Sequence, residues 1–426
     1  MKILLVTEFY PPAIMGGGEI NVHEIATMLA RKKIKVVILT SPTSLASEDE
    51  TVNGVRIIRK LKTGSNPNSL FQNIKRCFFL KLSLKKEIEL LIPEIKPDLI
   101  HFIGNTLIVA PVLAKINLPL CATIESYPAL CPKGDRLFHG DKECAITCSL
   151  TEFFKCQWLS SEIGKMKNRW YLRYNPLFLG GVYWYHAQLR KALGHCNLIA
   201  ISGYVQKILT QYGQNSTIVP NSVNVPQFKN NKLSIKPNKS TAKIKVLYIG
   251  SLVKYKGPQI LLRALQELEV HCDIYGNGNL KPELERMIQD KKLDVTIHPP
   301  VPYEEIISIY HSADIVVFPS LWPEPFGRIT IEAMAAGKPV VGSQIGGIKE
   351  VITPGTGIVF EPGNVEQLHD ALSLLVHNPA LRQKMGTEGQ KQVQREYGQE
   401  IIITKLIQNY QSIIQRPTAS LSKKSF

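Results

Sequence analysis

Apolar residues recur along the chain as short runs that alternate with segments of helical periodicity. Runs such as Lys2–Thr7, Lys35–Thr40 and Ile315–Phe318 have the length of buried strands, and Glu19–Arg31 carries its apolar residues on one helical face. Further strands are predicted at Asp98–Phe102, Leu118–Thr123, Leu198–Ile201, Thr217–Val219, Lys245–Ile249, Cys272–Tyr275, Val295–Ile297 and Pro339–Gly342. Strands that alternate with helices indicate an α/β protein with parallel sheets.

The alternation occurs twice, which indicates two domains with a ligand cleft between them. The stretch from Lys229 to Lys243 is polar, basic and without periodicity, as expected of a linker. The predicted division is 1–225 for the first domain with an irregular insertion at about 126–196, 226–243 for the linker, 244–398 for the second domain, 399–416 for a C-terminal helix and 417–426 for a tail.

The segment from Glu324 to Glu332 contains the strongest candidate chemistry. It follows the strand Ile315–Phe318, passes through a proline- and glycine-rich turn, and enters a helix near Gly327 or Arg328. A helix start presents unpaired N–H groups with partial positive charge and binds phosphate, and a glycine there allows close approach. Glu324 and Glu332 can accept hydrogen bonds from sugar hydroxyls, so a nucleotide sugar is the predicted ligand. The alternative is an ordinary amphipathic helix with a capping glutamate.

The Glu324–Glu332 segment is the first of three motifs that follow one another in this half of the chain. They are Glu324-Pro325-Phe326-Gly327 with Glu332, Gly337-Lys338-Pro339-Val340-Val341, and Ile345-Gly346-Gly347-Ile348-Lys349-Glu350. Together they resemble the signature of the retaining glycosyltransferases of family 4, and the resemblance extends over nearly the whole chain. It implies the GT-B fold, in which two Rossmann-like domains turn parallel sheets toward an interdomain cleft and the C-terminal helix crosses back to the first domain.

The resemblance also implies donor-binding residues. Lys256 matches the lysine that binds the donor diphosphate and stabilises its developing charge, whereas Ser251 stands where the family has an arginine. Arg328, at a position that is generally apolar, is a candidate for the missing cation. The glycine loop containing Gly17 and Gly18 matches the loop that closes over the diphosphate and the acceptor, although a flexible surface loop remains the alternative. The remaining implied donor contacts are Gly276, Val301, Phe326, Gly327 and Ile329.

Glu125 departs from the family pattern. The stretch from Thr123 to Cys131-Pro132 resembles a family segment in which a histidine lies near the reacting sugar, and Glu125 replaces that histidine. A carboxylate can act as a base on the acceptor hydroxyl, or the site can bind without turnover. The predicted catalytic residues are Glu324, Glu125 and Lys256.

Composition narrows the class of protein. The 426 residues are 44% hydrophobic and 20% charged, and 51 Lys and Arg against 35 Asp and Glu give a net charge of +16. The excess favours anionic partners. No basic tract or aromatic nucleic-acid motif is present, so nucleic acid is not expected. No signal-peptide core and no membrane-spanning segment is predicted, which favours a cytoplasmic protein, peripheral on the inner face of the membrane.

The stretch 56–86 is the candidate membrane-contacting segment. It contains nine basic residues and no acidic one, and Phe71, Ile74, Phe78 and Leu82 recur within it at helical spacing. An apolar stripe beside basic residues can lie on an anionic bilayer. The alternative is a core helix with a solvated basic face.

Four cysteines cluster in the irregular insertion, namely Cys131, Cys144, Cys148 and Cys156. They are weak candidates for a structural zinc site, because their spacings match no strong zinc pattern, and buried unmetallated thiols are favoured. A catalytic divalent ion is not expected, because no Asp-x-Asp motif is present, and no cofactor is expected.

The sequence thus predicts a retaining glycosyltransferase. It would move a sugar from a nucleoside-diphosphate-sugar to a hydroxyl of a glycan or lipid-linked acceptor, in cell-envelope polysaccharide or glycolipid synthesis. Two alternatives remain open: a catalytically inactive relative that binds sugar nucleotides or glycans, suggested by Ser251 and Glu125, and an epimerase or phosphorylase of similar architecture.

Overall fold

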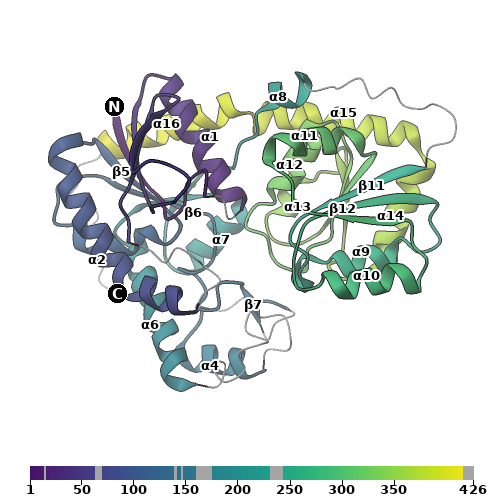
Figure 1. Ribbon diagram of the computed structural model, residues 1–426, viewed down its shortest axis with the longest axis horizontal. Coiled ribbons are helices and arrows are strands. Elements are labelled where there is room, and N and C mark those ends of the chain that lie inside the picture. The colour runs from purple at the N-terminus through teal and green to yellow at the C-terminus, as the bar shows by residue number, and fades with distance from the viewer. Residues whose placement is uncertain are drawn as a thin grey trace.

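The computed structural model describes residues 1–13, 16–62, 70–138, 142–144, 147–159, 175–230 and 243–415. Two α/β lobes lie side by side, with helix α15 (Pro379–Glu396) along the second and helix α16 (Gln399–Gln415) along the first (Figure 1). Within the described residues, no helix is long and apolar enough to cross a lipid bilayer. Predicted tail residues 417–426 and most of the predicted linker lie outside the described residues.

The first domain is built on a sheet with strand order β10-β9-β6-β5-β1-β2-β4-β3, in which only the β3–β4 pairing is antiparallel among those recorded. Its strands are β1 (Lys2–Val6), β2 (Lys35–Thr40), β3 (Asp49–Val52), β4 (Val55–Arg59), β5 (Leu99–Ile103), β6 (Leu120–Ile124), β9 (Asn197–Ala200) and β10 (Ser216–Ile218). Its helices are α1 (Gly17–Arg31), α2 (Leu70–Ile95), η1 (Gly104–Val109), α3 (Ala110–Leu113), α6 (Pro176–Leu193) and α7 (Gly203–Gln211).

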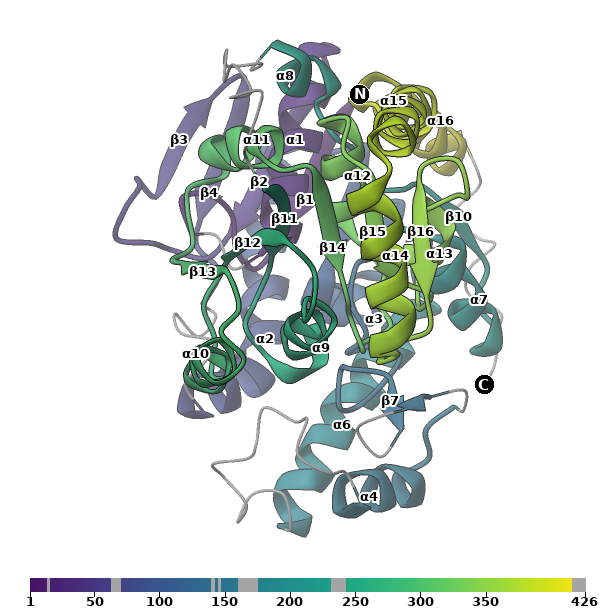
Figure 2. The ribbon, with the colours of Figure 1, turned by 90° about the vertical axis from the view of Figure 1, so that its right-hand side faces the viewer.

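The second domain contains a parallel sheet in the order β13-β12-β11-β14-β15-β16, seen behind α9, α10 and α14 in Figure 2. Its strands are β11 (Ile244–Ile249), β12 (Val270–Tyr275), β13 (Val295–His298), β14 (Ile315–Phe318), β15 (Val340–Ser343) and β16 (Gly357–Phe360). Its helices are η2 (Lys254–Lys256), α9 (Pro258–Ala264), α10 (Lys281–Asp290), α11 (Tyr303–Ser312), α12 (Arg328–Ala335), α13 (Ile348–Val351), α14 (Val365–His377) and α15 (Pro379–Glu396).

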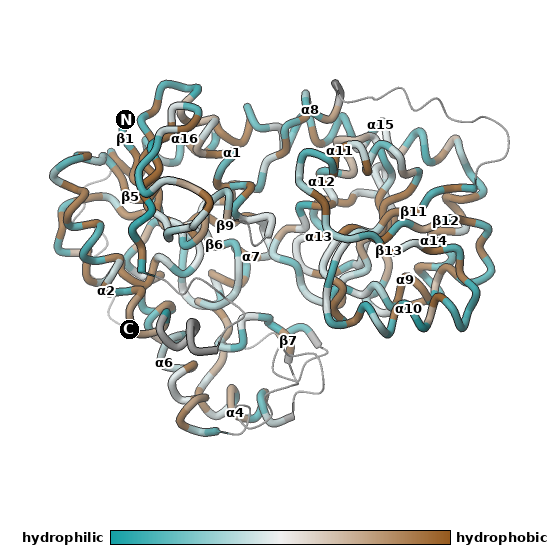
Figure 3. The backbone as a smooth tube through the Cα atoms, viewed as in Figure 1, coloured by the Kyte–Doolittle hydropathy of each residue, from teal (hydrophilic) through white to brown (hydrophobic). Residues whose placement is uncertain are grey.

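The strands supply the apolar centre of each domain, as the brown segments of β1, β5 and β11 show in Figure 3. Strands such as β5, β6 and β14 are buried at every position. Parallel strands covered by helices on both faces are expected to be continuously apolar, which is why these elements were predictable. Burial of this kind is the main favourable contribution to folding.

The irregular insertion contains more regular structure than its sequence indicates. It holds a small hairpin of β7 (Leu137–Phe138) and β8 (Lys142–Glu143), helix α4 (Leu150–Leu159) and the whole of α6. The N-cap of α6 is Asn175, whose side chain accepts a hydrogen bond from the Phe178 amide. This part lies below the first domain in Figure 1.

The predicted linker also differs from the structure at its start. Helix α8 (Val225–Asn230) occupies its first residues, and Phe228 is buried against the ring of Tyr310. His311 Nε2 lies 2.7 Å from the Phe228 carbonyl oxygen. The chain therefore reaches the second domain as a packed helix, because an apolar residue in a polar stretch found a long-range partner.

The two places where the chain passes between the domains are joined to each other. The Val223 amide donates to the Tyr397 carbonyl at 3.0 Å, and the Gln399 amide donates to the Val223 carbonyl at 3.3 Å. Val223 and Gly398 form a parallel bridge. The outgoing and returning segments thus lie side by side, close to the start of α16.

Helix α16 is predicted at 399–416 and observed at Gln399–Gln415. Its apolar residues Ile402, Ile403, Leu406, Tyr410 and Ile413 are buried in the core of the first domain. Tyr410 Oη lies 2.6 Å from His101 Nδ1, and His101 Nε2 lies 2.7 Å from Thr123 Oγ1. The predicted crossing back to the first domain is therefore confirmed.

We predict that Tyr410→Phe lowers the free energy of unfolding by about 1–3 kcal/mol, because one buried ring nitrogen of His101 loses its partner. Burial lowers the pKa of His101 to about 3, so the ring is neutral and gains no charge to compensate. Urea denaturation of the variant tests this, with Gln411→Ala on the exposed side of the same helix as the control. Equal stability of the two variants would contradict the prediction.

Candidate active site

The turn between β14 and α12 has the geometry that the sequence predicts. The helix begins at Arg328 and is preceded by Gly327, whose φ of 92° is left-handed. A Cβ at Gly327 would lie 3.1 Å from Ile348 Cγ1. The left-handed backbone conformation therefore favours glycine, and a side chain here would also be tightly packed against Ile348.

The start of α12 presents free amides. The first amide of this turn with a backbone acceptor is that of Thr330, which donates to the Gly327 carbonyl at 3.0 Å. Among the described residues, the amides from Phe326 to Ile329 have no hydrogen-bond acceptor. Unpaired amides at a helix N-terminus suit a phosphate group.

Lys256 and Glu324 form an ion pair beside this helix start. Lys256 Nζ lies 2.5 Å from Glu324 Oε1, and the two side chains are 20% and 8% exposed. Ser320 Oγ donates to the same carboxylate oxygen at 3.2 Å. The ammonium also lies 4.7 Å from the centre of the Trp322 ring. The site thus joins a cation with a carboxylate, the two groups that a sugar phosphate requires.

Glycine contacts bring these two groups together. Gly257 has a φ of 75° and is the N-cap of α9. A Cβ there would lie 1.8 Å from the Pro319 carbonyl oxygen, so the loop that carries Lys256 packs directly on the end of β14. A side chain at 257 would push the lysine away from Glu324.

The other predicted donor residues lie at the same edge of the sheet. Ser251, Gly276 and Val301 follow β11, β12 and β13, which lie in the order β13-β12-β11-β14, so that their carboxyl ends share one edge of the parallel sheet with that of β14. Ser251 is exposed and Val301 partly exposed. A Cβ at Gly276 would lie 1.9 Å from the Gly250 carbonyl oxygen, so these loops are in backbone contact. Ligands of open α/β sheets bind at this edge.

Glu332 is buried and accepts three hydrogen bonds. Its donors are Arg328 Nε at 2.7 Å, Tyr303 Oη at 3.1 Å and Tyr310 Oη at 3.0 Å. Three donors hold the carboxylate in a fixed position. A ribose hydroxyl would therefore meet an oriented acceptor, although one that already has partners.

Arg328 links the two domains. Its Nη2 donates to both carboxylate oxygens of Glu24 on α1, at 2.9 Å each, and to Tyr303 Oη at 2.8 Å. Burial raises the pKa of Glu24 more than the adjacent guanidinium lowers it. Arg328 Nη1 is buried and has no hydrogen-bond partner among the described residues. That Arg328 replaces the phosphate-binding arginine, which is Ser251 in this chain, stays a prediction.

Residues of the first domain cover the turn. Tyr127 Oη donates to the Pro323 carbonyl, and Ser202 Oγ donates to the Pro325 carbonyl at 2.5 Å. Trp322 Nε1 donates to the Asp135 carbonyl at 2.6 Å. The turn therefore lies at the interface of the two domains.

The first domain contributes a cavity of 330 Å³ next to the start of α1. The glycines at the start of this helix lie close to functional side chains: a Cβ at Gly18 would be 3.1 Å from Glu125 Oε2, and one at Gly17 would be 3.5 Å from Arg328 Cδ. The cavity is lined by Thr7, Glu8, Phe9, Gly16, Gly18, Glu19, Val22, Arg76, Ile103, Gly104, Asn105, Glu125 and Ser126.

Glu125 lies at the end of β6 and faces this cavity. Asn21 Nδ2 donates to its Oε1 at 3.2 Å. Burial raises the pKa of Glu125 to about 7, against the weaker effects of Asn21 and Arg328. A carboxyl group with this pKa can exchange a proton near neutral pH, which is the property that a base on an acceptor hydroxyl needs.

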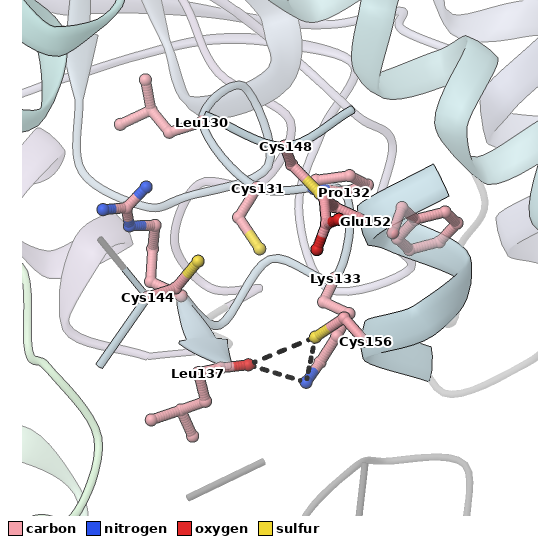
Figure 4. Close-up of a pocket in the computed structure, with 11 residues that line it drawn as sticks. Leu130, Cys131, Pro132, Lys133, Leu137, Cys144, Cys148, Glu152 and Cys156 are labelled. Carbon is pink, nitrogen blue, oxygen red and sulfur yellow. Dashed lines mark hydrogen bonds between the residues drawn. The ribbon is translucent and has the colours of Figure 1, made fainter. Parts of the chain in front are cut away.

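The four cysteines of the insertion line one small cavity of about 10 Å³, near the lower limit for one water molecule (Figure 4). Lys133 Nζ donates to the Leu137 carbonyl at 3.0 Å and to Cys156 Sγ at 3.8 Å. Burial raises the pKa of Cys148 to about 12. Within the described residues, no group of three or more His, Cys, Asp and Glu side chains is arranged to hold a metal ion.

The segment 56–86 does not form one basic surface. Arg56 and Arg59 lie on β4, where Arg56 pairs with Asp49 and Arg59 pairs with Glu50, each at 2.7 Å. Arg76 pairs with Glu8 at 2.5 Å in the cavity of the first domain. The basic residues of this segment thus lie on two elements, β4 and α2, and membrane contact by 56–86 stays a prediction. The side chains of Phe71 and Ile74 lie outside what the structure describes.

Several site residues were not predicted from the sequence. Glu24, Asn21 and Tyr303 contact predicted site residues, and the pair of Glu8 and Arg76 lies in the cavity. Glu8 follows the first strand, which is a signal for a site at a strand end. Asn21, Glu24, Arg76 and Tyr303 belong to helices, and no motif in their neighbouring sequence indicates their role.

The pattern that defines the family described as "Glycosyltransferase Family 4" matches residues 15–227, half of the chain. A second pattern, described as "Glycosyl transferases group 1", matches residues 229–392. The chain belongs to glycosyltransferase family 4. The resemblance stated from the Glu324–Glu350 motifs is therefore confirmed.

Individual relatives agree with this assignment. Over 437 residues the chain is 26% identical to an uncharacterized glycosyltransferase of Methanocaldococcus jannaschii, a match that covers 96% of this chain and 98% of the relative. Over 153 residues it is 33% identical to the D-inositol 3-phosphate glycosyltransferase of Pseudarthrobacter chlorophenolicus, covering 33% of this chain and only 36% of that relative. The crystal structure of Anabaena HepE in complex with UDP matches with a TM-score of 0.67 at 18% identity, over 97% of this chain and 100% of HepE, which confirms the GT-B fold.

We predict that Glu125→Gln changes how stability depends on pH. Because the folded-state pKa is raised from 4.5 to about 7, folding of the wild type is favoured by protonation, and this contribution is lost as the pH rises toward 7. The variant cannot ionise, so it gains stability relative to the wild type above pH 7 and matches it below pH 4.5. Urea denaturation across this range measures the difference. A constant difference at all pH values would contradict the shift.

We predict that Arg328→Met lowers the free energy of unfolding by about 3–5 kcal/mol, because it leaves Glu24 and Glu332 buried without their cation. Arg263→Met, at an exposed position on α9, is the matched control and stays within about 0.5 kcal/mol of the wild type. Thermal and urea unfolding measure both. A small loss of unfolding free energy in Arg328→Met would contradict this, and would mean that solvent or the tyrosines stabilise the two carboxylates without the guanidinium.

Proposed function

We propose that the chain is a retaining glycosyltransferase that moves a sugar from a nucleoside-diphosphate-sugar to a hydroxyl of a glycan or lipid-linked acceptor. Synthesis of a cell-envelope polysaccharide or a glycolipid is the setting that fits such an acceptor. The proposal goes beyond family membership in naming the donor class, the acceptor class and the stereochemical outcome.

The observation that carries the proposal is the ion pair of Lys256 and Glu324 beside the free amides of α12. The amides and the ammonium suit the two phosphates of the donor, and the carboxylate suits the hydroxyls of the transferred sugar. Glu332, on the second turn of the same helix, suits the ribose hydroxyls. The neighbour HepE is described in complexes with UDP and with UDP-glucose, which supports this donor class.

The reaction would proceed by attack from the face that the diphosphate leaves. The bond between the anomeric carbon and the diphosphate oxygen breaks, and the acceptor oxygen bonds to the same carbon. The proton of the acceptor hydroxyl passes to the leaving diphosphate or to Glu125. Lys256 and the α12 amides stabilise the charge that develops on the diphosphate, which needs no metal ion.

The acceptor would enter through the 330 Å³ cavity of the first domain, where Glu125 and the start of α1 meet. Relatives named as acting on D-inositol 3-phosphate and on a phosphatidylinositol monomannoside support a hydroxyl-rich or lipid-linked acceptor. The sequence also left open an inactive protein that binds a donor without turning it over. No contact described above favours that alternative.

We predict that Glu324→Gln and Lys256→Met each lower transfer by about 100-fold or more, since each removes a polar contact to the reacting groups. A thermal-shift screen with UDP, GDP, ADP and their sugars first identifies the donor, because a ligand of the native state raises its stability. Nucleoside diphosphate release and the anomeric configuration of the product are then measured. Glu361→Gln, at an exposed position, is the control and keeps full activity.

The outcomes separate the alternatives. Unchanged transfer in Glu324→Gln would reject the proposed site, and an inverted product would reject retention. Nucleotide binding without transfer or hydrolysis would identify an inactive binder. Free sugar formed without any acceptor, together with nucleoside diphosphate, would identify an epimerase.

A further inference from the structure

Large apolar side chains are exposed on two neighbouring helices of the first domain. On α2 these are Phe78, Phe79 and Leu82, which are 62%, 55% and 63% exposed; on α6 they are Leu177 and Trp184. The rings of Phe78 and Trp184 stack with their centres 6.4 Å apart. We call these five residues the apolar patch; α2 and α6 lie at the lower left of the molecule in Figure 1.

The patch is the outer face of helices whose other faces form the core. On α2 the residues Leu80, Leu84 and Ile88 are fully buried, and on α6 Leu179 and Leu189 are fully buried. The exposed residues are therefore additional to those needed for folding. A contiguous apolar surface of this kind marks a site of interaction with a protein or a membrane.

Basic residues adjoin the patch. Lys85 and Lys86 are exposed one turn beyond Leu82, and Lys191 is exposed at the end of α6. Lys81 Nζ donates to Gln188 Oε1 at 3.2 Å, which joins the two helices. The nearest acid on this face of α2 is Glu89, which lies 3.9 Å from Lys85. Arg59 and Arg76, in contrast, are held in largely buried ion pairs with Glu50 and Glu8.

We propose that the apolar patch docks onto an anionic lipid bilayer. The phenylalanine, leucine and tryptophan side chains would enter the boundary between headgroups and acyl chains, and the lysines would contact anionic headgroups. Stacked aromatic rings suit this boundary, where tryptophan is favoured. Apolar residues with exposed lysines beside them match an anionic bilayer better than a second copy of this basic chain, which the lysines would repel.

The docking surface is next to the acceptor cavity. Arg76, which lines that cavity, precedes Phe78 by two residues on α2. Docking would therefore hold the cavity close to the membrane surface, where a lipid-linked acceptor presents its sugar. This last step rests on the proposed function, whereas the docking itself does not.

We predict that the purified full chain co-sediments with vesicles of phosphatidylcholine and phosphatidylglycerol, and much less with phosphatidylcholine alone. Phe79→Ser combined with Leu82→Ser lowers the partition coefficient by about tenfold or more, because the favourable transfer of two large apolar side chains from water into the bilayer is lost. Leu374→Ser, which removes an equally exposed leucine from α14 of the second domain, leaves binding unchanged. Lys85→Gln with Lys86→Gln weakens binding to the anionic vesicles, and added salt does the same to the wild type.

Two further measurements make the test decisive. If the patch enters the bilayer, lipids with brominated acyl chains quench the fluorescence of Trp184. The Trp184→Phe variant, which lacks this contribution to the fluorescence, identifies the quenched tryptophan. Sedimentation velocity without lipid shows whether the patch instead joins two copies of the chain. The proposal is overturned by absent vesicle binding, by equal loss in Leu374→Ser, or by self-association that the patch variant abolishes. Nucleotide binding by thermal shift is independent of all these results, so failure of the proposed function remains distinguishable.

Discussion

The contact between Lys256 and Glu324 fixes the chemistry of the whole second domain. The lysine follows β11 and the glutamate follows β14, and these strands are neighbours in the sheet. Two opposite charges can remain in a largely buried place only as a well-formed pair, since either alone would lose its hydration without compensation. The close backbone packing at Gly257 holds their loops together. The ion pair therefore depends both on the order of the strands in the sheet and on the glycine at 257.

The strands and helices with strong local signals could be predicted from the sequence. The run Ile315–Phe318 and the glycine at 327 define β14 and the start of α12 by composition and backbone freedom alone. Strands β3 and β4 were missed because charged residues interrupt them. Arg59 becomes compatible with a buried strand through Glu50 and the carbonyls of Ser47 and Pro11. Helix α8 was missed because Phe228 finds its apolar partner, Tyr310, far along the chain.

The site shows the same limit. Residues on one turn, such as Glu324 and Gly327, are close in sequence and could be placed together in advance. Glu24 could not, because its position beside Arg328 depends on how the two domains face each other. The raised pKa of Glu125 likewise comes from burial by α1 rather than from its own neighbours in the chain. Charge alone also does not reveal that Arg56, Arg59 and Arg76 of the basic stretch 56–86 pair with acids that lie elsewhere in the chain.

The side-by-side passage of the chain between the domains limits how the molecule can open. Because Val223 is hydrogen-bonded to Tyr397 and Gln399, the two connections cannot move independently. While these hydrogen bonds hold, a swing of the lobes about this one point keeps the bonds, whereas sliding of the lobes past each other would break them. Such a swing would separate Arg328 from Glu24 and Ser202 from Pro325 together, and would admit or release a ligand in a single motion, as a jaw does.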